Sequence, residues 1–430
     1  MQDNNRQPDV NSDKRVPQRR KVKTIRLQKT RIRSSVDGVF LVLIVLLMCI
    51  GTIMVCSASY AYAQNQFDGD SLHFVRKQLW FVAGGLVVLG GVSLLDYVIV
   101  HKLSSFAFYV SLIMLGLVPI LGENWNGATR WIEIGPIQLQ PSEILKVTLV
   151  MYFADYNIRH RSKDSIFAKK IYAWCKNSRF EVLRNLRPPH QNRMKTFWTG
   201  IFPYVLFLGY VAILLWLQPH MSGLIIIGIE TIIMMILGRC SWGWLTAGGF
   251  MAACAGAGML LLKPHARTRI KTWLTPFDEM EYSFIRDNAW QPYQSVLAIG
   301  SGGLWGVGLG NSRQKHLFLP EPQNDYIFSI LCEEMGFIFA AFVIILFGVF
   351  IWRGFYIGLR APDKWSKCVV IGIMSKMAIQ IILNIAVVTN TLPSTGVPLP
   401  FFSYGGTALL VLMAEMGLIL NISKYSYVEK

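Results

Sequence analysis

Glycines, cations and a carboxylate occur together in residues 298–337, and these residue types suit chemistry on an anionic substrate. Arg313 and Lys315 follow a glycine-rich run and precede Asp325, which stands at the start of a long apolar segment. A carboxylate can take a proton from an attacking hydroxyl, and cations can stabilise a leaving group that gains negative charge. The glycines match neither a P-loop nor a dinucleotide fingerprint, so no nucleotide site is expected. A flexible loop is the alternative that glycine content alone allows.

A second polar block, NWNGATRWIEIGPIQLQPSEILK, covers residues 124–146. Arg130 lies between two tryptophans, and Pro141 occupies a position where a helix can begin. Glu143 and Lys146 are three residues apart, so on a helix they share one face and can pair, which allows two charges to persist at membrane depth. Two interpretations of the pair stay open. It is either a structural ion pair between helices or part of the lining of a polar cavity.

Two further segments could complete a site over the membrane. Residues 263–325 begin with four cations, among them Arg267, and continue with many aromatic residues. This mixture suits a loop that lies on the membrane surface over an anionic, partly apolar ligand. Residues 389–410, which contain Ser403, are rich in proline and glycine between two apolar runs. Irregular backbone at membrane depth is tolerated where it lines a cavity.

The elements that must position these residues are membrane helices. The chain has 430 residues, of which 53% are hydrophobic and 16% charged, and it contains ten apolar runs long enough to cross a bilayer. We therefore expect an all-α polytopic membrane protein with about ten transmembrane helices. The expected spans are 38–59, 78–97, 104–121, 142–157, 198–217, 221–238, 242–262, 326–352, 367–388 and 402–421.

The positions of the charges predict the orientation of these helices. With both termini inside, 30 of the 42 lysines and arginines fall in cytoplasmic segments, which the positive-inside rule favours. The large loop 263–325 between helices 7 and 8 then lies outside. The net charge of +17 is explained by basic segments near anionic membrane lipids, so no nucleic acid partner is expected.

The domain organisation follows from this topology. Residues 1–36 form a basic tail expected to be disordered in the cytoplasm, residues 37–424 a single transmembrane domain, and residues 425–430 a short cytoplasmic tail. Residues 158–197 form a cytoplasmic loop with an expected amphipathic helix. The seven cysteines and seven histidines show neither disulfide nor zinc-ligand spacing, so no built-in metal site is expected.

Three blocks of this sequence together resemble one protein family. They are NGATRWIEIGPIQLQPSEILK, GSGGLWGVGLGNSRQKHLFLPEPQNDYIFSILCEEMGF and TGVPLPFFSYGGTALL. In this order they are similar to the SEDS family (shape, elongation, division and sporulation), and GNSRQK followed by LPEPQND resembles the FtsW and SpoVE branch more than the RodA branch. The resemblance covers residues 37–424. It implies a ten-span peptidoglycan glycosyltransferase of the bacterial cytoplasmic membrane that polymerises lipid II, the undecaprenyl-diphosphate-linked precursor, on the outer face.

The resemblance also implies roles for individual residues and partners. Asp325 matches the family's essential aspartate and is the candidate catalytic base. The substrate-binding candidates are Arg130, Glu143, Lys146, Arg267, Lys315 and Ser403. A divalent cation, Mg²⁺ or Mn²⁺, could assist these cations. The expected protein partners are a class B penicillin-binding protein and other division or elongation proteins.

The chain departs from the family pattern in two places. The turn that often reads Pro-Asp-x-Gly has His220 in place of the aspartate, and residues 278–291 are longer than usual and have no assigned role. A lipid-linked precursor flippase is the alternative function, because a polar cavity with Glu143 and Lys146 would serve it too. The place of Asp325 at an outer membrane edge, away from the midplane, favours the enzyme. A purely structural scaffold would leave the charges of the outer loop unexplained.

Overall fold

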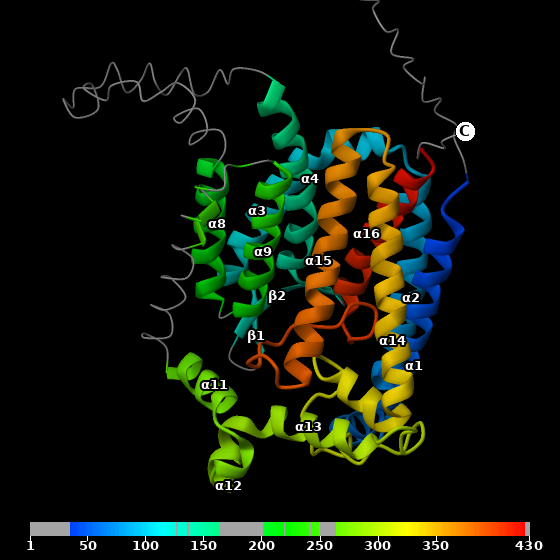
Figure 1. The fold of residues 1–430 in the computed structure, drawn as a ribbon, viewed down its shortest axis with the longest axis vertical. Coiled ribbons are helices and arrows are strands. Elements are labelled where there is room, and N and C mark those ends of the chain that lie inside the picture. Colours follow the sequence, from blue (N-terminus) through cyan, green and yellow to red (C-terminus); the bar gives the residue numbers. More distant parts are fainter. Residues whose placement is uncertain are drawn as a thin grey trace, which may run out of the picture.

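The fold is a bundle of long, roughly parallel and antiparallel helices with short helices and a small sheet at one end (Figure 1). This computed structural model describes residues 35–425 apart from 126–127, 136, 163–200, 219, 239, 241–242, 244, 247 and 250–263. Six described helices are long and apolar enough to cross a membrane. They are α1 (Gly38–Gln66), α2 (His73–Leu94), α3 (Tyr97–Leu121), α14 (Ile327–Leu359), α15 (Lys364–Val388) and α16 (Gly406–Ser423).

Three more helices run alongside these six: α4 (Pro141–Ser162), α8 (Phe202–Leu217) and α9 (Met221–Leu237). Helices α8 and α9 are apolar but have 16 and 17 residues, and α4 carries several charged side chains. These nine helices coincide with nine of the ten expected spans, whereas span 242–262 lies almost wholly outside the described residues. The count of ten and the inside-out orientation therefore stay predictions. The expected amphipathic helix and the tail 1–36 also lie outside the described residues, apart from the few residues at their borders.

The expectation of an all-α protein is wrong in one segment. The strands β1 (Glu123–Trp125), β2 (Ala128–Ile134) and β3 (Ile137–Leu139) form a three-stranded antiparallel sheet. The register pairs Asn124 with Thr129 and Ile132 with Leu139. The alternation of apolar and polar residues that indicates strands is hard to recognise here, because the tryptophans and glycines of this stretch suit a membrane interface equally well. The sheet contacts α3 and α4, and so it holds Arg130 over one end of the bundle.

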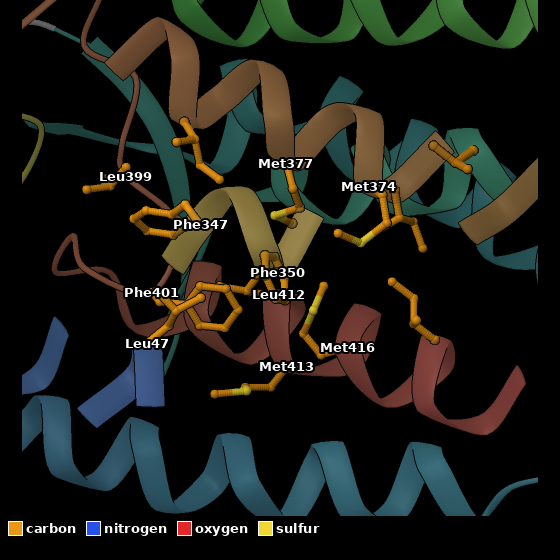
Figure 2. Close-up of a cluster of buried hydrophobic side chains, with 14 of the residues drawn as sticks. Leu47, Phe347, Phe350, Met374, Met377, Leu399, Phe401, Leu412, Met413 and Met416 are labelled. Atoms are coloured by element: carbon orange, nitrogen blue, oxygen red, sulfur yellow. The ribbon is translucent and has the colours of Figure 1, made fainter. Parts of the chain in front are cut away.

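Apolar side chains from four helices fill the middle of the bundle (Figure 2). Leu47 of α1, Phe350 of α14, Met377 of α15 and Met416 of α16 are all buried in this cluster. Phe401, from the segment between α15 and α16, is also buried among them. The irregular segment 389–405 is thereby anchored to the core.

The short helices lie across one end of the bundle, below the ends of the long helices in Figure 1. They comprise α11 (Pro264–Leu274), the 3₁₀ turn η2 (Phe277–Glu279), α12 (Tyr282–Phe284), the π-helical turn η3 (Ile285–Ala289) and α13 (Trp290–Gly302). Asp325 precedes α14 at this same end, which we call the Asp325 end.

Helix α14 is interrupted, and a glycine-rich segment repairs the interruption. Gly336 has φ +75° and ψ 179°, which breaks the helical hydrogen bonding within the 33 residues of α14. The glycine segment, residues 302–310, replaces the missing bonds with its own backbone. These bonds are Val307 N to Glu333 O (3.0 Å), Gly308 N to Glu334 O (2.9 Å), Phe337 N to Gly303 O (2.9 Å) and Ile338 N to Leu304 O (3.3 Å).

Two glycines are required for this contact between backbones. A Cβ on Gly306 would lie 2.2 Å from the carbonyl oxygen of Glu334, and one on Gly336 would lie 2.3 Å from the amide nitrogen of Gly306. Both residues also have positive φ, which only glycine adopts freely. The glycine segment is therefore a packed structural element, and the flexible loop that its composition allowed is wrong.

We predict that Gly306→Ala destabilises the protein by about 2–4 kcal/mol, because the methyl group meets backbone and the residue has positive φ. The midpoint of thermal unfolding in detergent should fall by about 5 °C or more. Gly300→Ala is the matched control, since a Cβ on Gly300 meets nothing within 4 Å. Equal midpoints for the two variants would contradict the packed contact.

Candidate active site

Asp325 lies where α14, α15 and the segment between α15 and α16 meet. The side-chain nitrogen of Asn384, on α15, donates to the carbonyl oxygens of Asp325 (2.7 Å) and Val397 (2.8 Å). Gly396 stands against the Asp325 carboxylate, because a Cβ there would lie 3.1 Å from Oδ2. Tyr326 is the N-cap residue of α14, and no described hydrogen bond joins the Asp325 carboxylate to the first N–H groups of that helix. The carboxylate is thus positioned by its backbone, and it does not serve as a helix cap.

The charges around Asp325 have opposing effects on its pKa. Burial raises the pKa of Asp325, its own backbone N–H lowers it, and the nearby Glu321 raises it further. Arg269 and Arg130 lower the pKa of Asp325. The net effect is a pKa above the ordinary value, which makes the carboxylate a better proton acceptor than an exposed aspartate.

Arg269 reaches this site from α11. Its guanidinium Nη1 donates to the carbonyl oxygen of Ser394 (2.9 Å), and the indole Nε1 of Trp273, one turn later, donates to that of Asn390 (3.1 Å). Two side chains on one face of α11 therefore hold it against the α15–α16 segment. The sequence analysis missed Arg269 and selected Arg267. The four-residue spacing of Arg269 and Trp273 was the available signal.

Arg130 approaches Asp325 from β2. Burial is the main cause that lowers the pKa of Arg130, and the neighbouring charge of Arg269 lowers it too, while Asp325 raises it. The expected site residue Arg130 and the unexpected Arg269 are thus brought together beside the carboxylate. Two guanidinium groups beside a half-buried carboxylate are an arrangement that can bind a diphosphate or another dianion.

His220 was also missed as a site residue. It lies in the turn between α8 and α9, is buried, and its Nδ1 has no hydrogen-bond partner among the described residues. Burial, followed by the charges of Arg130 and Lys146, lowers the pKa of His220 to about 3, although Glu143 opposes this. The ring is therefore neutral at physiological pH. It is close enough to both Arg130 and Lys146 to be influenced by their charges.

Glu143 and Lys146 form the ion pair that their spacing predicted. The Lys146 ammonium donates to the Glu143 carboxylate at 2.7 Å, and the Lys146 side chain is 2% exposed. Both lie in the first two turns of α4. The pair is more deeply placed than Arg130, and whether it contacts a substrate stays a prediction.

The Lys315 ammonium is bonded within the protein. It donates to the carbonyl oxygen of Gly310 (2.6 Å), to the Glu334 carboxylate (2.9 Å) and to the Ser57 hydroxyl (3.3 Å). The side chains of Lys315 and Glu334 are 3% and 0% exposed. All three ammonium protons are therefore used to fasten the glycine segment to α14 and α1, and this geometry does not favour a diphosphate contact.

The other two candidates occupy different surroundings. The Ser403 hydroxyl accepts from the amide of Leu399 (2.7 Å) and closes a turn within the α15–α16 segment. Arg267 lines a pocket on α11 with Ile270, Lys271, Leu274 and Thr275, and Asp325 does not line that pocket. Within the described part of the chain, no group of three or more histidines, cysteines or acidic residues could hold a metal ion.

Known proteins resemble this chain along nearly its whole length. The family model of the FtsW, RodA and SpoVE cell cycle proteins matches residues 38–428. Stage V sporulation protein E of Bacillus subtilis (strain 168) is 33% identical over 400 residues, which cover 92% of this chain and 99% of that protein. The probable peptidoglycan glycosyltransferase FtsW of Geobacter sp. (strain M18) is 31% identical over 389 residues, 90% of this chain and 96% of that protein.

The fold also occurs among solved structures. A chain from a structure described as the structural coordination of polymerization and crosslinking by a peptidoglycan synthase complex superposes with a TM-score of 0.67. The match covers 92% of this chain and 99% of that chain at 23% identity. At this identity the similarity establishes a shared fold, and it says nothing more about the site.

We predict that Lys315→Met destabilises the protein by about 3–5 kcal/mol, because it leaves the buried Glu334 carboxylate without its cation. Thermal unfolding in detergent measures this loss. Arg313→Met is the matched control, since it removes the same charge from an exposed side chain two residues away. Adding Glu334→Gln to Lys315→Met should restore part of the stability. Wild-type stability in the single Lys315 variant would instead favour a role in ligand binding.

Proposed function

The chain belongs to the family of FtsW, RodA and SpoVE cell cycle proteins and is a multi-pass protein of the cytoplasmic membrane, and on this premise we propose that it is a peptidoglycan glycosyltransferase that polymerises lipid II into glycan strands. The single observation that carries the proposal is the Asp325 carboxylate beside Arg130 and Arg269 at one end of the bundle. Relatives named probable peptidoglycan glycosyltransferase FtsW support it. The process served is cell division or sporulation.

The proposed reaction is a single displacement with inversion. Asp325 accepts the proton of the acceptor sugar hydroxyl as that oxygen attacks the anomeric carbon of the donor. The new carbon–oxygen bond forms while the bond from the anomeric carbon to the diphosphate oxygen breaks, and the electron pair leaves with the diphosphate. An α-linked donor thereby gives a β-linked product. No covalent enzyme intermediate is needed.

Arg130 and Arg269 are assigned to the departing diphosphate, which gains negative charge as the bond breaks. Guanidinium groups suit this task because they present two parallel N–H donors to phosphate oxygens. Arg267, two residues before Arg269 on α11, lines a different pocket and is assigned to the part of the ligand at the membrane surface. The Glu143–Lys146 pair and the neutral His220 lie deeper and are assigned to its inner boundary. Lys315 is left out of this set because its protons are used within the protein.

Three finer features belong to the same proposal. The Asp325 end faces the outside of the cell, as the distribution of lysine and arginine favours. A class B penicillin-binding protein is the proposed partner, since a glycosyltransferase leaves crosslinking to another protein, and the similar fold in a polymerising and crosslinking complex supports this. A divalent cation, if bound, would help to stabilise the negative charge of the diphosphate, and no step above depends on one.

A lipid-linked precursor flippase remains the second candidate, because Glu143 and Lys146 place charge inside the bundle. Such a protein would bind the same substrate without changing its covalent bonds. Asp325 at the end of the bundle favours the enzyme, since transporter sites lie near the midplane. The next experiment distinguishes the two functions.

We predict that Asp325→Asn abolishes glycan polymerisation, with a loss on the order of a hundredfold or more, because asparagine keeps the size of the side chain but cannot accept the proton. The measurement is glycan chain formation from purified lipid II, with the partner present and contaminating polymerases absent. Asp278→Asn, an exposed position in the same outer region, is the matched control. Near-wild-type polymerisation by Asp325→Asn would overturn the catalytic assignment and leave the flippase in place.

We also predict that Arg269→Gln moves the acid limb of the pH–activity profile to higher pH. Arg269 lowers the pKa of Asp325, so its removal raises that pKa, and the base is then protonated over a wider acidic range. Turnover at neutral pH should fall by about tenfold to a hundredfold as diphosphate stabilisation is lost.

Two variants control for the structural role of Arg269. Arg269→Lys keeps the charge and should restore the position of the acid limb, even if the bond to Ser394 is weakened. Lys271→Gln removes a cation from the same helix and should leave the limb unchanged, because the Lys271 ammonium lies over the Phe284 ring, 5.3 Å from its centroid. An unshifted limb in Arg269→Gln would show that Asp325 is not the titrating base.

A further inference from the structure

A second set of charges lies in the middle of the bundle, away from Asp325. Glu230 is nine residues from the start of α9, Lys376 twelve residues from either end of α15, and Glu415 nine residues from the start of α16. At a rise of about 1.5 Å per residue these positions are roughly 10–18 Å from the helix ends. That depth corresponds to the centre of a hydrocarbon core about 30 Å thick.

Side-chain packing places these groups at one level. Helices α9 and α15 are in contact, and Met234 Sδ lies 3.1 Å from the position of a Cβ on Gly372. Met234 is one turn after Glu230, and Gly372 is one turn before Lys376. Because the two helices run in opposite directions, Glu230 and Lys376 stand at the same height.

Helix α4 brings the Glu143–Lys146 pair to the same level. Val150 Cγ1 lies 2.6 Å from the same Cβ position on Gly372, and Lys146 is one turn before Val150. Since α4 also runs opposite to α15, Lys146 stands level with Lys376. The charges that influence Glu230 are accordingly those of Lys376, Glu415, Lys146 and Glu143.

One carboxyl group at this level, that of Glu230, has no hydrogen-bond partner among the described residues. The Lys376 ammonium donates to Glu415 Oε1, and Lys146 donates to Glu143. Glu230 is 1% exposed, and neither of its oxygens has a hydrogen-bond partner among the described residues. Glu415 Oε2 also has none. Helix α8, another neighbour of α9, adds no charge, because its only ionisable side chains are tyrosines.

Charge balance indicates which ligand the Glu230 carboxylate would bind. Two lysines and two glutamates form neutral pairs, so an ionised Glu230 would be an uncompensated charge at the membrane centre, which is strongly unfavourable. A metal cation would need several more oxygen ligands and would be repelled by the lysines. A proton needs only one carboxylate oxygen, and the resulting O–H can donate to the free oxygen of a neighbour such as Glu415.

We propose that Glu230 is a proton-binding site in the middle of the membrane, occupied at neutral pH and completed by Lys376 and Glu415. Release of this proton would leave a second carboxylate able to take the Lys376 ammonium from Glu415. Lys376 stays charged in either arrangement, and the proton passes to water or to the vacated Glu415. Protonation thus selects whether α15 is paired with α16 or with α9. The proposal does not rest on the glycosyltransferase activity.

Infrared spectroscopy of the full chain in lipid nanodiscs tests this directly. A protonated carboxylic acid has a carbonyl stretch that an ionised carboxylate lacks. The difference spectrum of wild type minus Glu230→Gln at neutral pH should contain this band, and the band should vanish from the wild type at high pH. Glu279→Gln, at an exposed position, is the control and should give no such difference. If the wild-type and Glu230→Gln spectra were the same in the region of this carbonyl stretch, the proposal would be overturned.

Two further measurements keep the test decisive. Spectra in sodium and in choline buffers distinguish the ligands, because a band that disappears whenever sodium is present would assign the site to that cation and overturn the proton. If Glu230→Gln fails to fold, Lys376→Met supplies a second variant. Removal of the lysine leaves Glu415 without a cation, so the band should grow, and an unchanged band would count against the site.

Discussion

Backbone hydrogen bonding between the glycine segment and the interrupted helix α14 is the interaction on which the Asp325 end depends. An interruption at Gly336 would leave N–H and C=O groups unsatisfied beside the membrane, where each costs several kcal/mol. Residues 302–310 satisfy them, and the buried Lys315–Glu334 pair fastens the same segment a second time. Only nine residues separate Lys315 from Asp325, so this contact limits where the carboxylate can lie.

The bundle places its charges according to the solvent available to them. At the Asp325 end, partial burial leaves Asp325 titratable, with guanidinium groups close enough to act on an anionic substrate. Deeper in the bundle, Lys146 and Lys376 each donate to a carboxylate, whereas the Glu230 carboxyl group has no hydrogen-bond partner among the described residues. Paired charges are compatible with a low dielectric, whereas chemistry needs a group that can change its charge. The same residue types therefore serve catalysis at one depth and cohesion or proton binding at another.

Rigid elements support the irregular segments of the site. Asn384 of α15 joins the backbone of Asp325 to that of Val397, and Tyr404 donates its amide to Gln323 at 2.8 Å. The loop before α14 and the segment before α16 are thus cross-linked by hydrogen bonds rather than free over the membrane. A ligand bound between α11, the sheet and these segments would meet a preorganised surface, which limits the reorganisation that catalysis must supply.

Periodicity and composition alone determined the membrane class, nine of the helices, and the Glu143–Lys146 pair, because these depend on contacts within three or four residues. The family followed from its three sequence blocks. Only the tertiary structure decided which cations lie near Asp325, since Lys315 and Arg269 differ in their long-range partners and hardly in their local sequence. The role of the glycines and the isolation of Glu230 were likewise decided by helices distant in sequence, whose close approach no local pattern encodes.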